Sequence, residues 1–211
     1  MNSIIISGLP GAGKSSIGKI LSERLNLEHY TTGELFKSIG KGTLTNETYY
    51  SDFMELCRKK DLSISFLNST NDSEAAEAVW KSDLGKDKRF HEVLDEMQTA
   101  LAKKGNIIID GKLAIHMAGS HGFKIWIKAS KEKRAQRIGS RDGLSREKSI
   151  EKLDLRDLTE REEWLRIYNL DILDQEEKSD LIIDTTDLSI EEAVELILKN
   201  LSLKLQRSPV N

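Results

Sequence analysis

The chain has 211 residues, with 32 Lys or Arg, 35 Asp or Glu and a formal net charge of −3 at pH 7. Because the two signs are mixed along the chain, neither nucleic acid nor a membrane surface is expected as the main partner. The single cysteine, Cys57, excludes an internal disulfide and suits a reducing compartment. With no signal peptide before the first strand and no apolar run of membrane-spanning length, we expect a cytoplasmic protein with one domain over residues 1–211.

The first predicted element is a buried strand over residues 3–7, followed by Gly8-Leu9-Pro10-Gly11-Ala12-Gly13-Lys14-Ser15. This stretch fits G-x-x-x-x-G-K-[ST], the phosphate-binding P-loop. Its glycines let successive N–H groups face an anion, and the helix predicted over residues 13–25 turns its positive end to the same phosphates. Lys14 would bridge the β- and γ-phosphates, and the Ser15 hydroxyl would ligate Mg²⁺. An ordinary glycine turn is the alternative, but the flanking strand and helix favour binding of a nucleoside triphosphate.

The next stretch predicts a short strand at residues 28–30 and then a short helix capped by Thr32. Residues 40–85 are polar and helix-prone, which predicts a helical insert with a loop at residues 68–73. A long amphipathic helix is expected over residues 90–104, because its apolar residues recur at helical spacing.

Three more strands are predicted at residues 107–110, 123–127 and 181–184. Helices are predicted between and after them: one capped by Ser130 and reaching about residue 141, most of residues 144–174, and residues 189–201 before a frayed end. Alternating strands and helices predict an α/β fold with a doubly wound parallel sheet, and ligands are expected beyond the carboxyl ends of its strands.

Asp110 ends a strand of three isoleucines, where a carboxylate can reach the Mg²⁺ shell through a water molecule. The alternative is a helix N-cap for the segment after Gly111. The four histidines and Cys57 show no metal-ligand spacing, and the three tryptophans are scattered without a stacking pattern for nucleic acid.

Arg134, Arg137 and Arg141 are spaced to share one helix face. Such a face is either solvated or clamps phosphate. Arg156 and Arg161 lie in a densely charged segment, which is either a solvated helix or a mobile lid that brings cations to the reacting group on closure.

Taken together, these features resemble the nucleoside monophosphate kinases, and in particular the archaeal-type cytidylate kinases. The similarity covers most of the chain and rests on an ordered set of motifs. Besides the P-loop, these are Thr31-Thr32-Gly33-Glu34-Leu35-Phe36-Lys37, Leu101-Ala102-Lys103-Lys104-Gly105-Asn106, Ile109-Asp110-Gly111-Lys112-Leu113-Ala114, Ile125-Trp126-Ile127-Lys128-Ala129-Ser130, Tyr168-Asn169-Leu170-Asp171 and Leu181-Ile182-Ile183-Asp184-Thr185.

The resemblance implies a monomeric kinase that moves the γ-phosphoryl group of Mg-ATP to CMP or dCMP, with acceptor-binding helices at about residues 32–104 and a lid at about residues 143–174. The expected ATP-binding residues are Gly8, Pro10, Gly11, Ala12, Gly13, Lys14, Ser15, Ser16, Arg137, Arg141, Asp184 and Thr185. The expected acceptor-binding residues are Thr32, Gly33, Phe36, Lys37, Asp95, Gly111 and Lys112. The expected catalytic residues are Lys14, Arg156 and Arg161, with Ser15 and, through water, Asp110 at the metal.

The chain departs from the family pattern on the acceptor side. Lys37 and Lys112 replace arginines, and lysine cannot make the planar two-point contact of a guanidinium. Glu96-Met97 stands where the family has two arginines, and the insert at about residues 43–85 is longer. Two alternatives therefore stay open: a kinase of another small metabolite, such as shikimate or dephospho-coenzyme A, and a nucleotide-binding regulator without activity.

Overall fold

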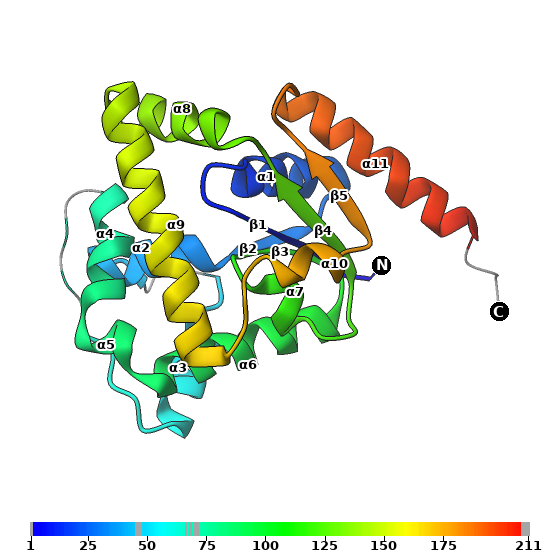
Figure 1. Cartoon of the computed structure of the whole chain (residues 1–211). Helices are drawn as coiled ribbons and strands as arrows, with labels where there is room; N and C mark the ends of the chain where they lie inside the picture. The colour runs from blue at the N-terminus through cyan, green and yellow to red at the C-terminus, as the bar shows by residue number, and fades with distance from the viewer. Residues whose placement is uncertain (1, 45–47, 66, 68, 70–71, 208–211) are drawn as a thin grey trace.

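The computed structural model (Figure 1) describes residues 2–44, 48–65, 67, 69 and 72–207. Its centre is a five-stranded, fully parallel sheet in the order β2-β3-β1-β4-β5. The strands are β1 (Ile4–Gly8), β2 (Glu28–Thr31), β3 (Ile107–Asp110), β4 (Phe123–Lys128) and β5 (Leu181–Asp184). The predicted doubly wound parallel sheet is confirmed. Since β1 lies between β3 and β4, the loop that leaves its carboxyl end lies at the topological switch point where ligands bind in such sheets.

Eleven helices are present in the described part of the chain. They are α1 (Lys14–Leu25), α2 (Thr32–Lys41), α3 (Tyr50–Lys59), α4 (Asp72–Lys81), α5 (Asp83–Lys86), α6 (Lys88–Lys104), α7 (Ala114–Met117), α8 (Lys131–Asp142), α9 (Arg146–Tyr168), α10 (Asp174–Glu177) and α11 (Ile190–Arg207). The side chain of Ser130 caps α8, as predicted, by accepting from the backbone N–H of Lys133.

The isoleucine strands feed two apolar cores because successive side chains of a strand point to opposite faces. Ile4 and Ile6 face α1 and α11, whereas Ile5 belongs to a larger core that α6, α7 and the insert complete on the other face. Both faces of the sheet are therefore covered, which explains why the strands read as continuous apolar runs.

Several predicted boundaries change. Thr31, not Thr32, is the N-cap of α2; Thr32 is already helical, and no side-chain hydrogen bond caps the helix. The loop expected at residues 68–73 is only partly testable because residues 68, 70 and 71 lie outside the described residues, and Asp72 and Ser73 already belong to α4. α11 continues past residue 201 to Arg207, and the frayed end predicted beyond it falls on residues that are not described.

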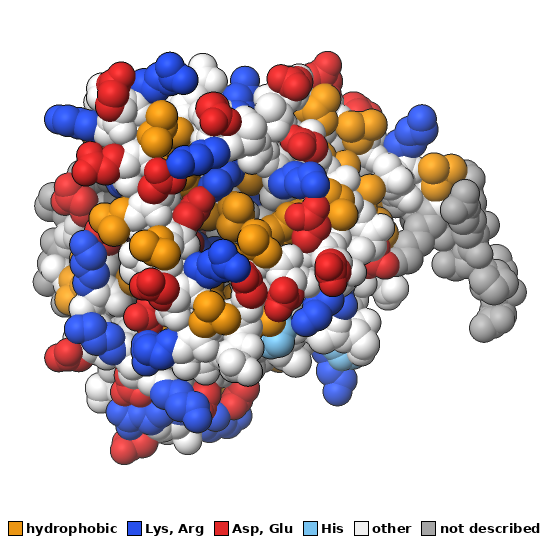
Figure 2. Space-filling model, viewed as in Figure 1, with side chains coloured by type: hydrophobic (Ala, Val, Ile, Leu, Met, Phe, Trp, Pro, Cys, Tyr) orange, Lys and Arg blue, Asp and Glu red, His pale blue; other side chains and the backbone are white. Residues whose placement is uncertain are grey.

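Acidic and basic side chains intermingle over the face seen in Figure 2. Within the described ranges, no helix combines the length and the apolar character needed to cross a bilayer.

Candidate active site

The P-loop connects β1 to α1 through three glycines with positive φ: Gly8 at 151°, Gly11 at 77° and Gly13 at 105°. A Cβ atom on Gly8 would stand 2.0 Å from the backbone oxygen of Ile127, and one on Gly11 would stand 2.8 Å from that of Arg134. The loop thus packs against β4 and α8 so closely that side chains at these positions would collide. Glycine is required here by contact as well as by backbone conformation.

Lys14 begins α1 and folds back over the loop, where its Nζ donates to the backbone oxygen of Leu9 at 3.0 Å. Burial lowers the pKa of Lys14 to about 8, although the nearby carboxylate of Asp110 acts in the opposite direction. The ammonium group therefore lies in a desolvated position beside the loop, where an anionic ligand would stabilise its charge.

Asp110 joins the P-loop helix to the neighbouring strand. Its Oδ1 accepts a hydrogen bond from Ser15 Oγ at 3.0 Å, and its Oδ2 lies 2.6 Å from His29 Nε2. The carboxylate is almost fully buried, at 2% exposure. A Cβ atom on Gly18 would stand 2.6 Å from His29 Nε2, so a larger residue at position 18 of α1 would push the His29 ring away from Asp110. Sequence reasoning missed His29, since nothing in its spacing pointed to Asp110.

The alternative role for Asp110, as a helix cap, is wrong: α7 begins only at Ala114, and its N-cap is Leu113. A hydroxyl and a carboxylate oxygen are the hard ligands that Mg²⁺ prefers, usually together with waters and substrate phosphates. Within the described part of the chain, no group of three or more His, Cys, Asp or Glu side chains could hold an ion by itself. Ser15 and Asp110 therefore fit a magnesium ion that arrives with a phosphate ligand.

Arg134 on α8 ties the P-loop to α9. Its two terminal nitrogens meet both oxygens of Asp157 at 3.2 and 2.8 Å, and one of them also donates to the backbone oxygen of Pro10 at 3.2 Å. The side chain is only 5% exposed, so it does not belong to a solvated basic face. Its contacts identify it as a structural link among three segments.

The other two α8 arginines differ. Arg137 donates to the Thr185 hydroxyl at 2.9 Å and backbone oxygen at 2.7 Å, and to the backbone oxygen of Ala12 at 3.2 Å. It thereby joins the P-loop to the segment after β5. Arg141 pairs with its neighbour Asp142 at 2.7 Å and is more than half exposed, so its guanidinium stays accessible.

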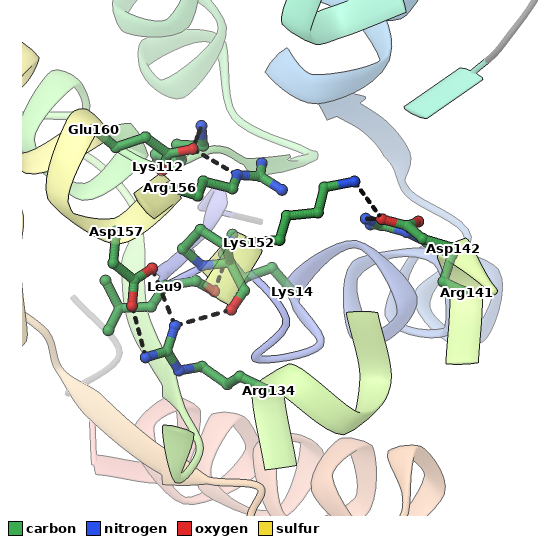
Figure 3. Close-up of polar contacts among 11 residues, drawn as sticks. Leu9, Lys14, Lys112, Arg134, Arg141, Asp142, Lys152, Arg156, Asp157 and Glu160 are labelled. Atoms are coloured by element: carbon green, nitrogen blue, oxygen red, sulfur yellow. Dashed lines mark hydrogen bonds and ion pairs between the residues drawn. The ribbon is translucent and has the colours of Figure 1, made fainter. Parts of the chain in front are cut away.

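On α9, Glu160 contacts two cationic side chains (Figure 3). Its Oε1 accepts from Lys112 Nζ at 2.5 Å and from Arg156 Nε at 2.7 Å. Burial raises the pKa of Glu160, but the charges of Lys112 and Arg156 outweigh burial, and the net pKa lies below the ordinary value. Lys112 and Arg156 in turn act electrostatically on Lys14. The structure thus brings Lys14, Lys112 and Arg156 together, from the P-loop, the β3–α7 connection and α9.

The expected acceptor side is lined by aromatic rings from separate elements. Trp80 of the insert lies 6.0 Å from Phe36 of α2 and 5.0 Å from Trp164 of α9, measured between ring centroids. Lys112 Nζ lies 5.7 Å from the centre of the Trp80 ring. Trp80 and Trp164, which are far apart in the sequence, are therefore neighbours, and the insert reaches the residues expected to hold the acceptor.

Buried polar atoms surround Gly111. A Cβ atom at this glycine would stand 2.8 Å from Thr32 Oγ1 and 3.2 Å from Gln98 Oε1. Neither oxygen has a hydrogen-bond partner among the described residues. Nearby on the same side, Asp95 accepts from the Tyr168 hydroxyl at 3.0 Å, and burial raises the pKa of Asp95 to about 7. These groups can offer hydrogen bonds to a polar ligand.

Three predicted site residues lie apart from this cluster. Lys37 pairs with Glu34 on the same helix, and Arg161 pairs with Asp171, which lies just beyond the end of α9. Asp184 accepts from the backbone N–H of Thr186 at 2.9 Å. Their expected roles stay predictions. Glu160 and Trp164 were not predicted, yet their spacing from Arg156 by four and eight residues places all three on one helical face.

With this geometry in view, comparison with known proteins decides the family. The model of the cytidylate kinase-like family matches residues 3–187, from β1 to the turn before α11. This chain belongs to the cytidylate kinase-like family.

Curated cytidylate kinases show the same relationship. The enzyme of Methanocaldococcus jannaschii is 29% identical over 145 residues, which cover 67% of this chain and 65% of that protein. The enzyme of Caldicellulosiruptor bescii is 31% identical over 150 residues, which cover 64% of this chain and 66% of that protein. The matched region spans about two thirds of the length of these cytidylate kinases.

Solved structures share the fold at lower identity. An uncharacterized protein from Eubacterium ventriosum matches 96% of this chain and 99% of its own, with TM-score 0.57 and 16% identity. The shikimate kinase from Acinetobacter baumannii, solved in complex with shikimate, matches 100% of this chain and 96% of its own, with TM-score 0.55 and 18% identity. At this identity the likeness shows a fold that this member of the cytidylate kinase-like family shares with shikimate kinases.

Proposed function

We propose that this protein transfers the γ-phosphoryl group of Mg-ATP to a nucleoside monophosphate, with CMP or dCMP as the acceptor. The observation that carries the proposal is the convergence of Lys14, Lys112 and Arg156 beside Glu160, between the P-loop and α9. Family membership and the named cytidylate kinases support the choice of acceptor.

In the proposed reaction, the bond between the γ-phosphorus and its bridging oxygen to the β-phosphate breaks, and a bond to an oxygen of the acceptor phosphate forms. ADP leaves with the electron pair. The attacking oxygen is already ionised, so no general base has to remove a proton. Catalysis then depends on positioning the two phosphates and neutralising the charge on the transferring group.

The residues of this chain divide that task. The P-loop backbone would hold the β-phosphate, and Lys14 would lie against the β- and γ-oxygens. Lys112 would hold the acceptor phosphate, and Arg156 would lie over the transferring group when α9 covers the site. Ser15 and Asp110, the latter through water, would hold Mg²⁺, which supplies charge neutralisation at the phosphates when bound.

The other expected site residues would contact the two substrates around these groups. Thr32, Gly33 and Phe36 would line the acceptor with Gly111, while Asp95 and Lys37 would supply polar groups. Arg137, Arg141, Asp184 and Thr185 would lie along the donor nucleotide. We expect the protein to act as a monomer in the cytoplasm.

The test is a panel of acceptors at fixed Mg-ATP, read as ADP formed: CMP, dCMP, UMP, AMP, GMP, shikimate and dephospho-coenzyme A. The proposal expects kcat/KM to be highest for CMP or dCMP. If shikimate or dephospho-coenzyme A turns over faster than every nucleotide, the protein is a metabolite kinase, and the altered acceptor residues and the insert that carries Trp80 would bind that metabolite. No turnover with any acceptor would favour a nucleotide-binding regulator.

A further inference from the structure

Glu160 is the one acidic side chain that contacts both Lys112 and Arg156 in the described part of the chain. One oxygen of its carboxylate serves both cations, at 2.5 and 2.7 Å. The residue is 7% exposed, and its other oxygen has no hydrogen-bond partner among the described residues. Burying a carboxylate costs free energy unless its partners repay it. Lys112 and Arg156 supply that compensation, because their charges outweigh the burial of the carboxylate. The way in which Glu160 holds the two cations is therefore the feature to explain.

The contact with Arg156 is made by the edge of the guanidinium. Glu160 accepts from Nε, and the two terminal nitrogens of Arg156 have no hydrogen-bond partner in the described ranges. Figure 3 shows this terminal end pointing away from Glu160. An arginine has five N–H donors, so four remain in the planar fork that matches two phosphate oxygens. Lys112 likewise keeps two of its three donors after binding Glu160.

Aromatic contacts beside Glu160 hold α9 against the insert. Trp164 follows Glu160 by one helical turn and packs edge-on against Trp80 at 5.0 Å, while the Trp80 ring lies 5.7 Å from Lys112 Nζ. Asp157, the other carboxylate at this point of α9, is already bound to Arg134. Among the described residues, the side-chain hydrogen bonds of Glu160 go to Lys112 and Arg156.

We propose that Glu160 is a positioning residue for phosphoryl transfer: it anchors Arg156 and Lys112 by one donor each and turns their remaining donors toward the phosphates. The inference rests on the proposed function and adds to it the residue that aligns the cations. Glu160 does not touch substrate in this account. It acts through Arg156 and Lys112, so its removal misaligns them while the P-loop stays intact.

The test compares Glu160→Gln with wild type, using whichever acceptor of the panel gives the fastest turnover. Loss of the anchor should lower kcat by about 10- to 100-fold, while KM for ATP changes by less than about threefold. Calorimetry should give the same affinity for Mg-ADP in both proteins. Glu163→Gln is the matched control, because Glu163 pairs with Arg166 at 2.5 Å on the same helix without reaching the cluster. It should behave as wild type.

A double-mutant cycle separates positioning from a structural effect. Since Glu160 acts in part through Arg156, the combined loss of kcat in Glu160→Gln with Arg156→Ala should be smaller than the product of the two single losses, and the remaining effect of Glu160→Gln is the part that acts through Lys112. Fully additive losses, an unchanged kcat in Glu160→Gln, or an equal loss in Glu163→Gln would overturn the proposal. If Glu160→Gln does not fold, Glu160→Asp, which keeps the charge but shortens the reach, is measured in its place, and a wild-type kcat there would contradict the anchor.

A probe that needs no acceptor distinguishes failure of the proposed function from failure of the proposal for Glu160. Mg-ADP with aluminium fluoride imitates the transferring phosphoryl group, and Arg156 should bind it. Glu160→Gln should weaken binding of fluoroaluminate in the presence of Mg-ADP by about tenfold without weakening Mg-ADP itself. If no acceptor turns over, the proposed function fails, and equal fluoroaluminate binding in the two proteins would refute the anchor independently.

Discussion

Ser15 Oγ donates a hydrogen bond to Asp110 Oδ1 across 3.0 Å, which joins the first turn of α1 to the end of β3. The two residues are 95 positions apart, and the parallel pairing of β1 with β3 brings them together. An oxygen pair of this kind at the carboxyl edge of the sheet is where we expect Mg²⁺ to be held.

Asp110→Asn should raise the Mg²⁺ concentration needed for half-maximal activity by about tenfold or more, because an amide orients metal-bound water less strongly than a carboxylate. The measurement is a magnesium titration of the initial rate at saturating ATP. Asp174→Asn, an exposed change on α10, is the control and should match wild type. An unchanged magnesium requirement in Asp110→Asn would remove Asp110 from the metal site.

Arg134→Met should destabilise the fold by about 2–4 kcal/mol, since it leaves Asp157 and a P-loop carbonyl without their partner. The estimate lies below the cost for a fully buried pair because the Asp157 side chain keeps 27% exposure. Urea unfolding measures the change. Arg141→Met, on the same helix, removes a mostly exposed guanidinium, and Asp142 keeps Lys152 as a partner at 2.9 Å, so this change should cost less than about 1 kcal/mol. Equal losses in the two variants would mean that Arg134 is not the link between the P-loop and α9.

Asp95 predicts a pH-dependent stability. Burial raises its pKa from the ordinary value of 3.8 to about 7, so between these pH values the folded state holds a proton that the unfolded state has released. Stability should therefore fall as pH rises from about 4 to 7, and Asp95→Asn should remove that fall. The difference in the free energy of unfolding, variant minus wild type, should therefore be about 1–3 kcal/mol more favourable to the variant at pH 8 than at pH 4. Parallel stability curves for the two proteins would contradict the shifted pKa.

Much of this fold is predictable from the sequence for a simple reason. Runs such as Ile4-Ile5-Ile6 and Ile107-Ile108-Ile109 have to be buried on both faces, which a parallel sheet between helix layers provides. The P-loop pattern likewise predicts the conformation of the β1–α1 connection, because its glycines are needed at contacts with β4 and α8.

The acceptor side is less predictable because it is assembled by tertiary contact. The local sequence does not predict that Trp80 contacts Trp164, because these residues lie on α4 and α9, which are far apart in the chain. It does not predict the contact of His29 with Asp110 either, which depends on the pairing of β2 with β3. Glu160 belongs to a densely charged segment. In that sequence, only its spacing of four residues from Arg156 indicates that the two side chains share one face of the helix.

Replacing Lys37 and Lys112 by arginine tests the acceptor directly. Arginine can bind a phosphate through two parallel hydrogen bonds. If both side chains hold the acceptor, Lys37→Arg with Lys112→Arg should lower KM for CMP by about 5- to 30-fold, which corresponds to about 1–2 kcal/mol. The single variants show which lysine matters, and Lys112→Arg is expected to dominate, because Lys37 pairs with Glu34 instead of the cluster. A double variant with the wild-type KM for CMP would mean that cytidylate is not held there.

The central claim is that the phosphoryl group moves from ATP to the phosphate of a nucleoside monophosphate. Phosphorus NMR of a mixture of protein, Mg²⁺, ATP and CMP follows both ends of that transfer at once. We predict that the ATP γ-signal and the CMP phosphate signal decline in equal amount while the diphosphate signals of ADP and CDP grow, and that Lys14→Met, folded as judged by circular dichroism, shows none of these changes. Loss of the γ-signal with growth of inorganic phosphate and no CDP, or full CDP formation by Lys14→Met, would contradict the account.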